Sequence, residues 1–173
     1  MKRLMPRLVL VVLVAVLCVV LVSLSAEAGE KKKISGTNKL GTVLARSIAF
    51  PDNFPKHEMH QLVRKDTVIS CSDPEWVGME LWTYDQNDRM GGKVSDRGYN
   101  VYLLKSGEKV FVRFESPLTI TAKEGGAWEI TGEGSYEYIG GTGKFKDLKG
   151  RGTYKAKITP EMGISIWEGE MEY

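Results

Sequence analysis

The sequence predicts an all-β protein, an antiparallel β-barrel of about eight strands. Apolar and polar residues alternate with period two in most segments after residue 56, as in strands with one buried face. Turn signals rich in glycine and proline separate these segments at regular intervals, and no strong helical period follows the first 28 residues. Closure into a barrel would remove the two exposed edges of such a sheet.

The N-terminus has the pattern of a secretory signal. Three basic residues precede an apolar run from Leu8 to Leu24, and small residues flank Glu27 in Ala26-Glu27-Ala28. We therefore expect residues 1–28 to form a signal helix that is cleaved after Ala28, which makes the protein secreted or periplasmic. The alternative is an uncleaved anchor in the inner membrane facing outward, although the run is short of the ~20 apolar residues of a full span. Membrane contact is expected only in that case.

Residues 29–173 are enough for one domain. Residues 29–38, with three consecutive lysines, are expected to be a flexible polar lead-in, and residues 39–173 a single β-barrel domain. The predicted signal holds three of the 24 basic and one of the 22 acidic residues, which leaves 21 of each. Such a balance argues against a nucleic-acid partner. Cys71 is the one cysteine outside the signal, so no internal disulfide is expected; a buried inert thiol is favoured over a reactive thiol or an intermolecular bridge.

The first half of the domain predicts two strands after one ambiguous segment. Residues 40–50 fit a strand or a short helix equally, and residues 51–55, with two prolines, predict a loop. Residues 57–70 and 76–85 predict strands, and residues 86–92 a polar loop. In the second of these strands the side chains of Glu80, Trp82 and Tyr84 share one face, and those of Met79, Leu81 and Thr83 share the other.

The second half predicts hairpins. Residues 98–105 and 109–115 flank a turn at Ser106-Gly107-Glu108, and Ser116-Pro117 is expected to break the second strand. Further extended segments are residues 118–123, 127–139, 152–158 and 164–172.

The glycine-rich, basic stretch from Tyr138 to Lys155 could be mistaken for a phosphate-binding loop. Such a loop requires Ser or Thr after its Gly-Lys pair to hold Mg²⁺, but Phe145 follows Gly143-Lys144. The flanking segments are extended rather than helical. We therefore interpret the stretch as the turn of a hairpin and predict no nucleotide and no other cofactor.

This stretch also carries a resemblance. The segments GYNVYLLKSGEKVFVRFE, GAWEITGEGSYEYIGGTGKF and GGTGKFKDLKGRGTY resemble secreted bacterial proteins with an allene oxide cyclase-type barrel, within the calycin-like, dirigent-like group of small β-barrels. The resemblance covers roughly residues 76–173 and departs from the family at Asp147, where a glycine is frequent. It implies the barrel fold. Most bacterial members are uncharacterised, and the catalytic set of the plant cyclase cannot be placed on these positions residue by residue, so the catalytic residues stay unknown.

Five residues are candidates for ligand binding. The face with Glu80, Trp82 and Tyr84 combines aromatic walls with a few polar groups, as small-molecule pockets do, although ordinary packing also explains it. Arg113 and Glu115 share a face of their strand; they would orient a ligand inside the barrel or form an ion pair on its outer surface. His57 and His60 are the only histidines. Zinc normally takes three or four protein ligands, so no metal is predicted.

We therefore expect a secreted or periplasmic barrel that binds a small apolar or amphipathic molecule. A binding protein is favoured over an enzyme. One alternative is an enzyme of the isomerase or cyclase type, with Glu80, Tyr84, Arg113 or Glu115 acting in the lumen. The other is a non-catalytic module that forms homo-oligomers through the sides of the barrel.

Overall fold

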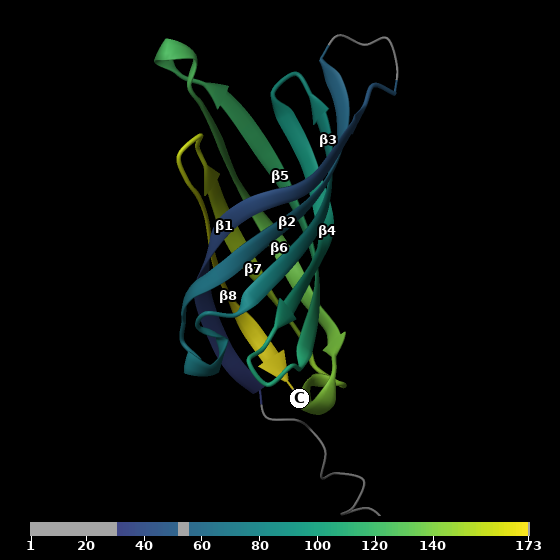
Figure 1. Ribbon diagram of the computed structural model, residues 1–173, viewed down its shortest axis with the longest axis vertical. Coiled ribbons are helices and arrows are strands. Elements are labelled where there is room, and N and C mark those ends of the chain that lie inside the picture. Colours follow the sequence, from purple (N-terminus) through teal and green to yellow (C-terminus); the bar gives the residue numbers. More distant parts are fainter. Residues whose placement is uncertain (1–30, 52–55, 173) are drawn as a thin grey trace, which may run out of the picture. The chain divides into compact units, whose positions relative to one another are not determined.

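The computed structural model describes residues 31–51 and 56–172, which form one antiparallel sheet of eight strands closed into a barrel (Figure 1). The predicted all-β barrel is confirmed, whereas the predicted signal lies outside the described residues. No helix in these two ranges has the length and apolar character that a membrane crossing requires. The strands are β1 (Lys31–Ala49), β2 (His57–Cys71), β3 (Glu80–Met90), β4 (Lys93–Leu103), β5 (Lys109–Ala122), β6 (Trp128–Gly141), β7 (Lys149–Ile158) and β8 (Gly163–Glu172), with short 3₁₀-helices η1 (Pro74–Trp76), η2 (Glu124–Gly126) and η3 (Gly143–Phe145).

Each strand pairs with the next along the chain, and β8 returns to β1. The seam between β8 and β1 runs from Lys31 opposite Glu172 to Leu40 opposite Gly163. β1 continues beyond this seam to Ala49, and in the described part of the chain residues 41–49 pair with β2 alone. The first strand thus pairs with β8 alone at its start, with both neighbours over residues 36–39, and with β2 alone in its upper part (Figure 1).

β1 begins inside the segment that the sequence predicts to be a flexible lead-in. That prediction is wrong for residues 31–38, which pair with β8. Ile34 is only 2% exposed, and Ile34, Gly36 and Asn38 all point inward. The polar composition was misleading because Lys31 and Lys33 occupy outward positions, where a strand tolerates charge, and Lys32, near the start of the strand, pairs with Asp73 at 2.6 Å. The ambiguous residues 40–50 continue the same strand as far as Ala49.

Two other predicted interruptions are absent from the strands. β3 continues to Met90, so the predicted loop at residues 86–92 shrinks to Gly91 and Gly92, which have φ of 57° and 89°. β5 continues through Pro117, where the sequence predicts a break. Pro117 lies opposite Ser95 of β4. Proline lacks one ladder donor, but here the neighbouring pairs hold the strand in register.

Inward glycines lie beside large inward side chains on neighbouring strands. Gly36 pairs with Trp167, and a Cβ atom at Gly36 would lie 2.5 Å from the indole Cζ2. Gly152 pairs with Tyr136, and a Cβ atom there would lie 2.5 Å from the phenol Cζ. An eight-stranded barrel has little interior space. The glycines therefore let aromatic rings lie flat against the wall and leave part of the interior free.

One end of the barrel is closed by a hydrophobic floor. Trp76 of η1, Phe145 of η3, Met79 and Leu148 are each 1% exposed. The Trp76 ring lies 5.3 Å from that of Tyr102 and 6.4 Å from that of Phe145, measured between centroids. Because η3 is the turn between β6 and β7, the hairpin interpretation of the glycine-rich stretch is confirmed. Its apolar residues seal the barrel.

Candidate functional site

The three predicted site residues of β3 point out of the barrel. Tyr84 is 44% exposed, and Glu80 and Trp82 are half-buried on the same outer face. The Trp82 indole donates to the Glu80 carboxylate, and Lys65 Nζ lies 2.5 Å from the other oxygen of that carboxylate. The predicted alternation is present, but a lumen position for these residues is wrong. Period two separates two faces of a strand without telling which one is inside.

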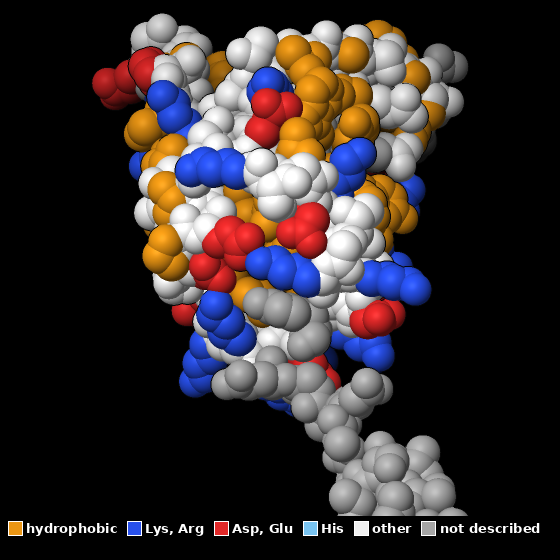
Figure 2. Space-filling model, turned by 60° about the horizontal axis from the view of Figure 1, so that its bottom comes forward, with side chains coloured by type: hydrophobic (Ala, Val, Ile, Leu, Met, Phe, Trp, Pro, Cys, Tyr) orange, Lys and Arg blue, Asp and Glu red, His pale blue; other side chains and the backbone are white. Residues whose placement is uncertain are grey.

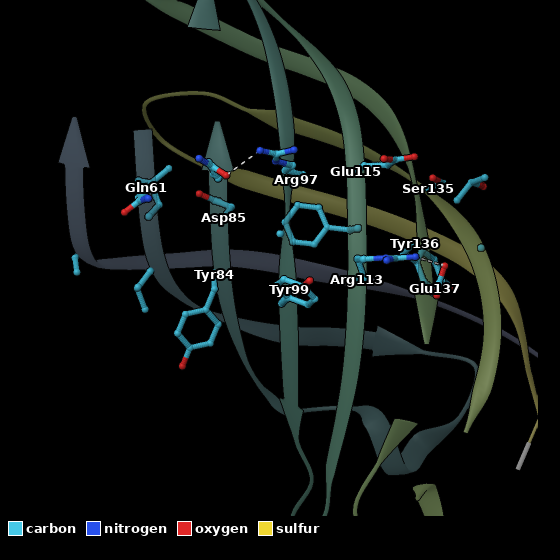
Figure 3. Close-up of a pocket in the computed structure, with 18 of the residues that line it drawn as sticks. Gln61, Tyr84, Asp85, Arg97, Tyr99, Arg113, Glu115, Ser135, Tyr136 and Glu137 are labelled. Atoms are coloured by element: carbon cyan, nitrogen blue, oxygen red, sulfur yellow. Dashed lines mark hydrogen bonds and ion pairs between the residues drawn. The ribbon is translucent and has the colours of Figure 1, made fainter. Parts of the chain in front are cut away.

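Arg113 and Glu115 also point outward, so a lumen role is wrong for them too. Arg113 Nη2 forms a surface ion pair at 3.0 Å, with Glu137 of β6 rather than with Glu115. Figure 3 shows Tyr84, Tyr99, Arg113 and Glu137 in succession across β3 to β6. Side chains of both charges are mixed on the molecular surface (Figure 2).

An open depression of about 1250 Å³ crosses this outer face, and Tyr84, Arg113 and Glu115 line it. Arg113 already has a carboxylate partner, and Arg97 donates to Gln86 at 3.2 Å. The lumen is smaller, but it holds buried polar atoms that lack partners, as described below. We therefore take the lumen as the candidate site.

A cavity of about 210 Å³ lies inside the barrel above the floor. Its walls differ in chemistry. Strands β2, β3 and β4 contribute a polar wall, and strands β5 to β8 contribute a mainly apolar and aromatic wall. The polar wall includes Arg64, Asp66, Asp85, Asn87, Arg89 and Asp96, and the apolar wall includes Phe114, Leu118, Ile130, Tyr154 and Ile158.

Asp66 is the best-satisfied group of the polar wall. Arg64 Nε donates to both of its oxygens, at 2.8 and 3.0 Å. The Thr83 hydroxyl donates at 2.9 Å, and the backbone N–H of Gly41 donates at 2.8 Å. A buried carboxylate with this many donors is held firmly in place. Asp66 therefore anchors Arg64 and ties β1, β2 and β3 together.

Asp85 and Asp96 have fewer partners. Asp85 lies 3.6 Å from Arg64 Nη1, and its Oδ1 is buried without a hydrogen-bond partner in the described structure. Asp96 accepts a hydrogen bond from Asn87 Nδ2 at 2.6 Å. Burial raises the pKa of Asp85 to about 6, and burial together with repulsion from Asp85 raises the pKa of Asp96 to about 7. Carboxyl groups with such pKa values can both give and take protons near neutral pH.

Two more atoms of the polar wall are buried without a partner among the described residues, Arg89 Nε and Asn100 Oδ1. The first is a donor, whereas Asn100 Oδ1 and Asp85 Oδ1 are acceptors. An unsatisfied buried polar group costs roughly 1–3 kcal/mol. A molecule that brought complementary donors and acceptors into the cavity would recover part of that cost.

The histidines and the cysteine lie apart from one another. His60 points inward on the same face as Glu58, as the alternation predicts, and its Nε2 lies 2.6 Å from Glu58 Oε2. His57 Nε2 lies 3.0 Å from Asp88 Oδ1. Cys71 is half-buried, and burial raises the pKa of its thiol. In residues 31–51 and 56–172, no three His, Cys, Asp or Glu side chains are grouped so that they could hold a metal ion.

Alternation does not reveal the polar wall, because residues 85–90 are polar on both faces except at Met90. One signal could have revealed it. Gly91-Gly92 is a two-residue hairpin turn, which extends the preceding strand to Met90. Counting back then places Arg89, Asn87 and Asp85 on the same face as Thr83 and Leu81.

Comparisons with known proteins concern the fold. No protein-family model and no curated protein matches the sequence. The structure is similar to the pterocarpan synthase dirigent protein, with 12% identity, a TM-score of 0.48, and coverage of 84% of this chain and 89% of that chain. It is also similar to a conserved protein of unknown function from Rhodopseudomonas palustris, with 8% identity, a TM-score of 0.40, and coverage of 84% and 99%. The strand order by itself shows the closed antiparallel barrel of eight strands.

Proposed function

We propose that this protein, secreted or periplasmic, binds a small amphipathic molecule in the lumen of its barrel. One observation carries the proposal: a polar wall with unpaired buried atoms faces an apolar, aromatic wall across a single cavity. A ligand with a polar and an apolar side would satisfy both walls. The volume of about 210 Å³ is below the range of about 300–1,000 Å³ for drug-sized ligands. The ligand is therefore a compact molecule with about one ring.

Native mass spectrometry of protein purified from its own cell envelope tests this proposal. We expect a bound small molecule that is lost when the cavity is filled by Ala156→Phe, since Ala156 points into the cavity from β7. Lys155→Phe adds the same ring at the neighbouring, outward position and should keep the ligand. Ala156→Leu is a milder filling variant if the first one folds poorly. Ligand retained in every folded filling variant, or no ligand in the wild type, would contradict lumen binding.

A second candidate is an isomerase or cyclase that acts in the same lumen, and the raised pKa values of Asp85 and Asp96 favour it. Such an enzyme would move a proton within its substrate and leave the mass unchanged. The small molecule recovered from the purified protein should then be converted to an isomer by the wild type and not by Asp96→Asn. Chromatography separates the two isomers and is the readout. Return of the molecule unchanged by the wild type would leave a binding protein.

A further inference from the structure

Two arginines stand at the mouth of the lumen, the end opposite the floor. Arg46 lies on the part of β1 that pairs only with β2, and its Nη2 donates to His60 Nδ1 at 2.9 Å. Arg89 lies near the end of β3, and its Nη2 donates to Asn87 Oδ1 at 3.0 Å. Neither guanidinium has a carboxylate within ion-pair distance in the described structure, and Arg89 Nε is buried without any partner. Burial and repulsion from Arg46 lower the pKa of Arg89.

His60 adds no charge to this group. A guanidinium can only donate, so His60 Nδ1 accepts from Arg46 and His60 Nε2–H donates to Glu58. The ring is 1% exposed, and burial lowers its pKa, so it stays neutral at neutral pH. We call Arg46, Glu58, His60 and Arg89 the mouth cluster. Two arginines and one glutamate give this cluster a net charge of about +1.

The acids deeper in the lumen attract Arg89 without pairing with it. Asp85 and Asp96 both favour its charged form, but neither lies within ion-pair distance of Arg89 in the described structure, where Asp85 contacts Arg64 at 3.6 Å. Asp66 is already committed to Arg64. Both guanidinium groups of the mouth cluster therefore lack a carboxylate contact, and one of their donors, Arg89 Nε, has no acceptor in the described structure.

We infer that the mouth cluster binds the carboxylate of the ligand, which is a small amphipathic monocarboxylic acid. The inference rests on the proposed lumen binding. The planar fork of arginine matches a carboxylate, whereas a second carboxylate would have to lie against the apolar wall or beside the lumen acids. The apolar part of the acid then lies deeper, against Leu118, Ile130 and Ile158 of the opposite wall.

Two matched probes test the inference by isothermal titration calorimetry. Phenylbutanoate carries a ring and a carboxylate, and phenylbutanamide replaces the carboxylate by a neutral amide of the same shape. The wild type should bind the acid about 10-fold or more tightly than the amide, a difference that is expected of a charge-assisted contact. Arg89→Met should remove this preference and leave amide binding within about twofold of the wild type. Arg46→Met, at an exposed position, should reduce it as well.

Arg113→Met is the control, because it removes an arginine from the outer face. It should keep the full preference for the acid. Equal binding of acid and amide by the wild type would overturn the carboxylate inference and leave lumen binding intact. A preference that survives in both Arg89→Met and Arg46→Met would also overturn it. If the wild type binds neither probe, the proposed lumen binding fails together with the inference.

Discussion

The indole of Trp167 lies across Gly36, its partner on the neighbouring strand, and its Nε1 donates to Asn38 Oδ1 at 3.0 Å. Trp167 belongs to β8, whereas Gly36 and Asn38 belong to β1, so a single side chain bridges the seam that closes the barrel. The flat arrangement depends on the absence of a side chain at Gly36.

Replacement of Gly36 by alanine should therefore weaken the seam. The new methyl group would meet the indole, and overpacking of this kind costs roughly 1–3 kcal/mol. Urea unfolding measures the free energy of unfolding directly. Ser35→Ala, at the adjacent outward position, should change that free energy little. A Gly36→Ala variant as stable as the wild type would show that the indole can move aside at no cost.

The stability of the protein should depend on pH through Asp85 and Asp96. Their pKa values, about 6 and about 7, exceed the value of about 3.9 in the unfolded chain. The folded state thus binds more protons between these limits, so both groups favour folding at low pH and lose that contribution as pH rises to about 8. His60 acts in the opposite direction, because burial lowers its pKa.

The difference between the wild type and Asp→Asn variants isolates the two acids, because His60 is present in both. Asp96→Asn and Asp85→Asn should gain stability relative to the wild type at pH 8, on the order of 1 kcal/mol or more, and much less at pH 5. Urea unfolding at the two pH values is the measurement, and Asp147→Asn, at an exposed turn position, is the control. The same difference at both pH values would argue against raised pKa values.

Loss of Arg64 should be far more harmful than loss of Arg113. Arg64 neutralises Asp66, which is 2% exposed, and it is the nearest cation to Asp85. Arg64→Met leaves these carboxylates without their partner, and breaking a buried pair costs about 3–5 kcal/mol. The Arg113–Glu137 pair is exposed, so Arg113→Met should leave the free energy of unfolding almost unchanged. Equal losses for the two variants, measured by urea unfolding, would refute the distinction between a buried and a surface pair.

Trp76 should be the most sensitive position of the floor. Its ring contacts the rings of Tyr102, Tyr138, Phe145 and Trp167. Trp76→Ala should lower the free energy of unfolding by about 3–5 kcal/mol, as large-to-small replacements of buried aromatic residues do. Thermal unfolding followed by circular dichroism is the test. Trp128→Ala, at a position 39% exposed at the end of β6 away from η3, should have a much smaller effect; a comparable effect would mean that burial in the floor does not explain the loss at Trp76.

Much of the fold could be predicted from local signals. The hairpin of β4 and β5 follows from Gly107, which has a φ of 86° that other residues rarely adopt. The inward set Tyr154, Ala156 and Ile158 follows from alternation along β7. These features depend on neighbours in the sequence, and the sequence shows them.

The candidate site could not be predicted in the same way. Alternation in β3 separates Trp82 and Tyr84 from Leu81 and Thr83, but the choice of the inner face depends on how much space seven other strands leave. Leu81 and Thr83 lie inside, and the larger Trp82 and Tyr84 lie outside. Large aromatic side chains are usually expected on the buried face of a strand. The mouth cluster draws on β1, β2 and β3, and such a meeting of side chains depends on strand register, which no single segment contains.

The floor gives the lumen a direction. Because Trp76 and Phe145 fill one end, a molecule that enters from the mouth must lead with one of its ends and leave the other facing the solvent. The floor alone does not decide which end enters first, so in the proposed complex that choice would fall to the mouth cluster. A ligand held there would then present the same end to the solvent each time.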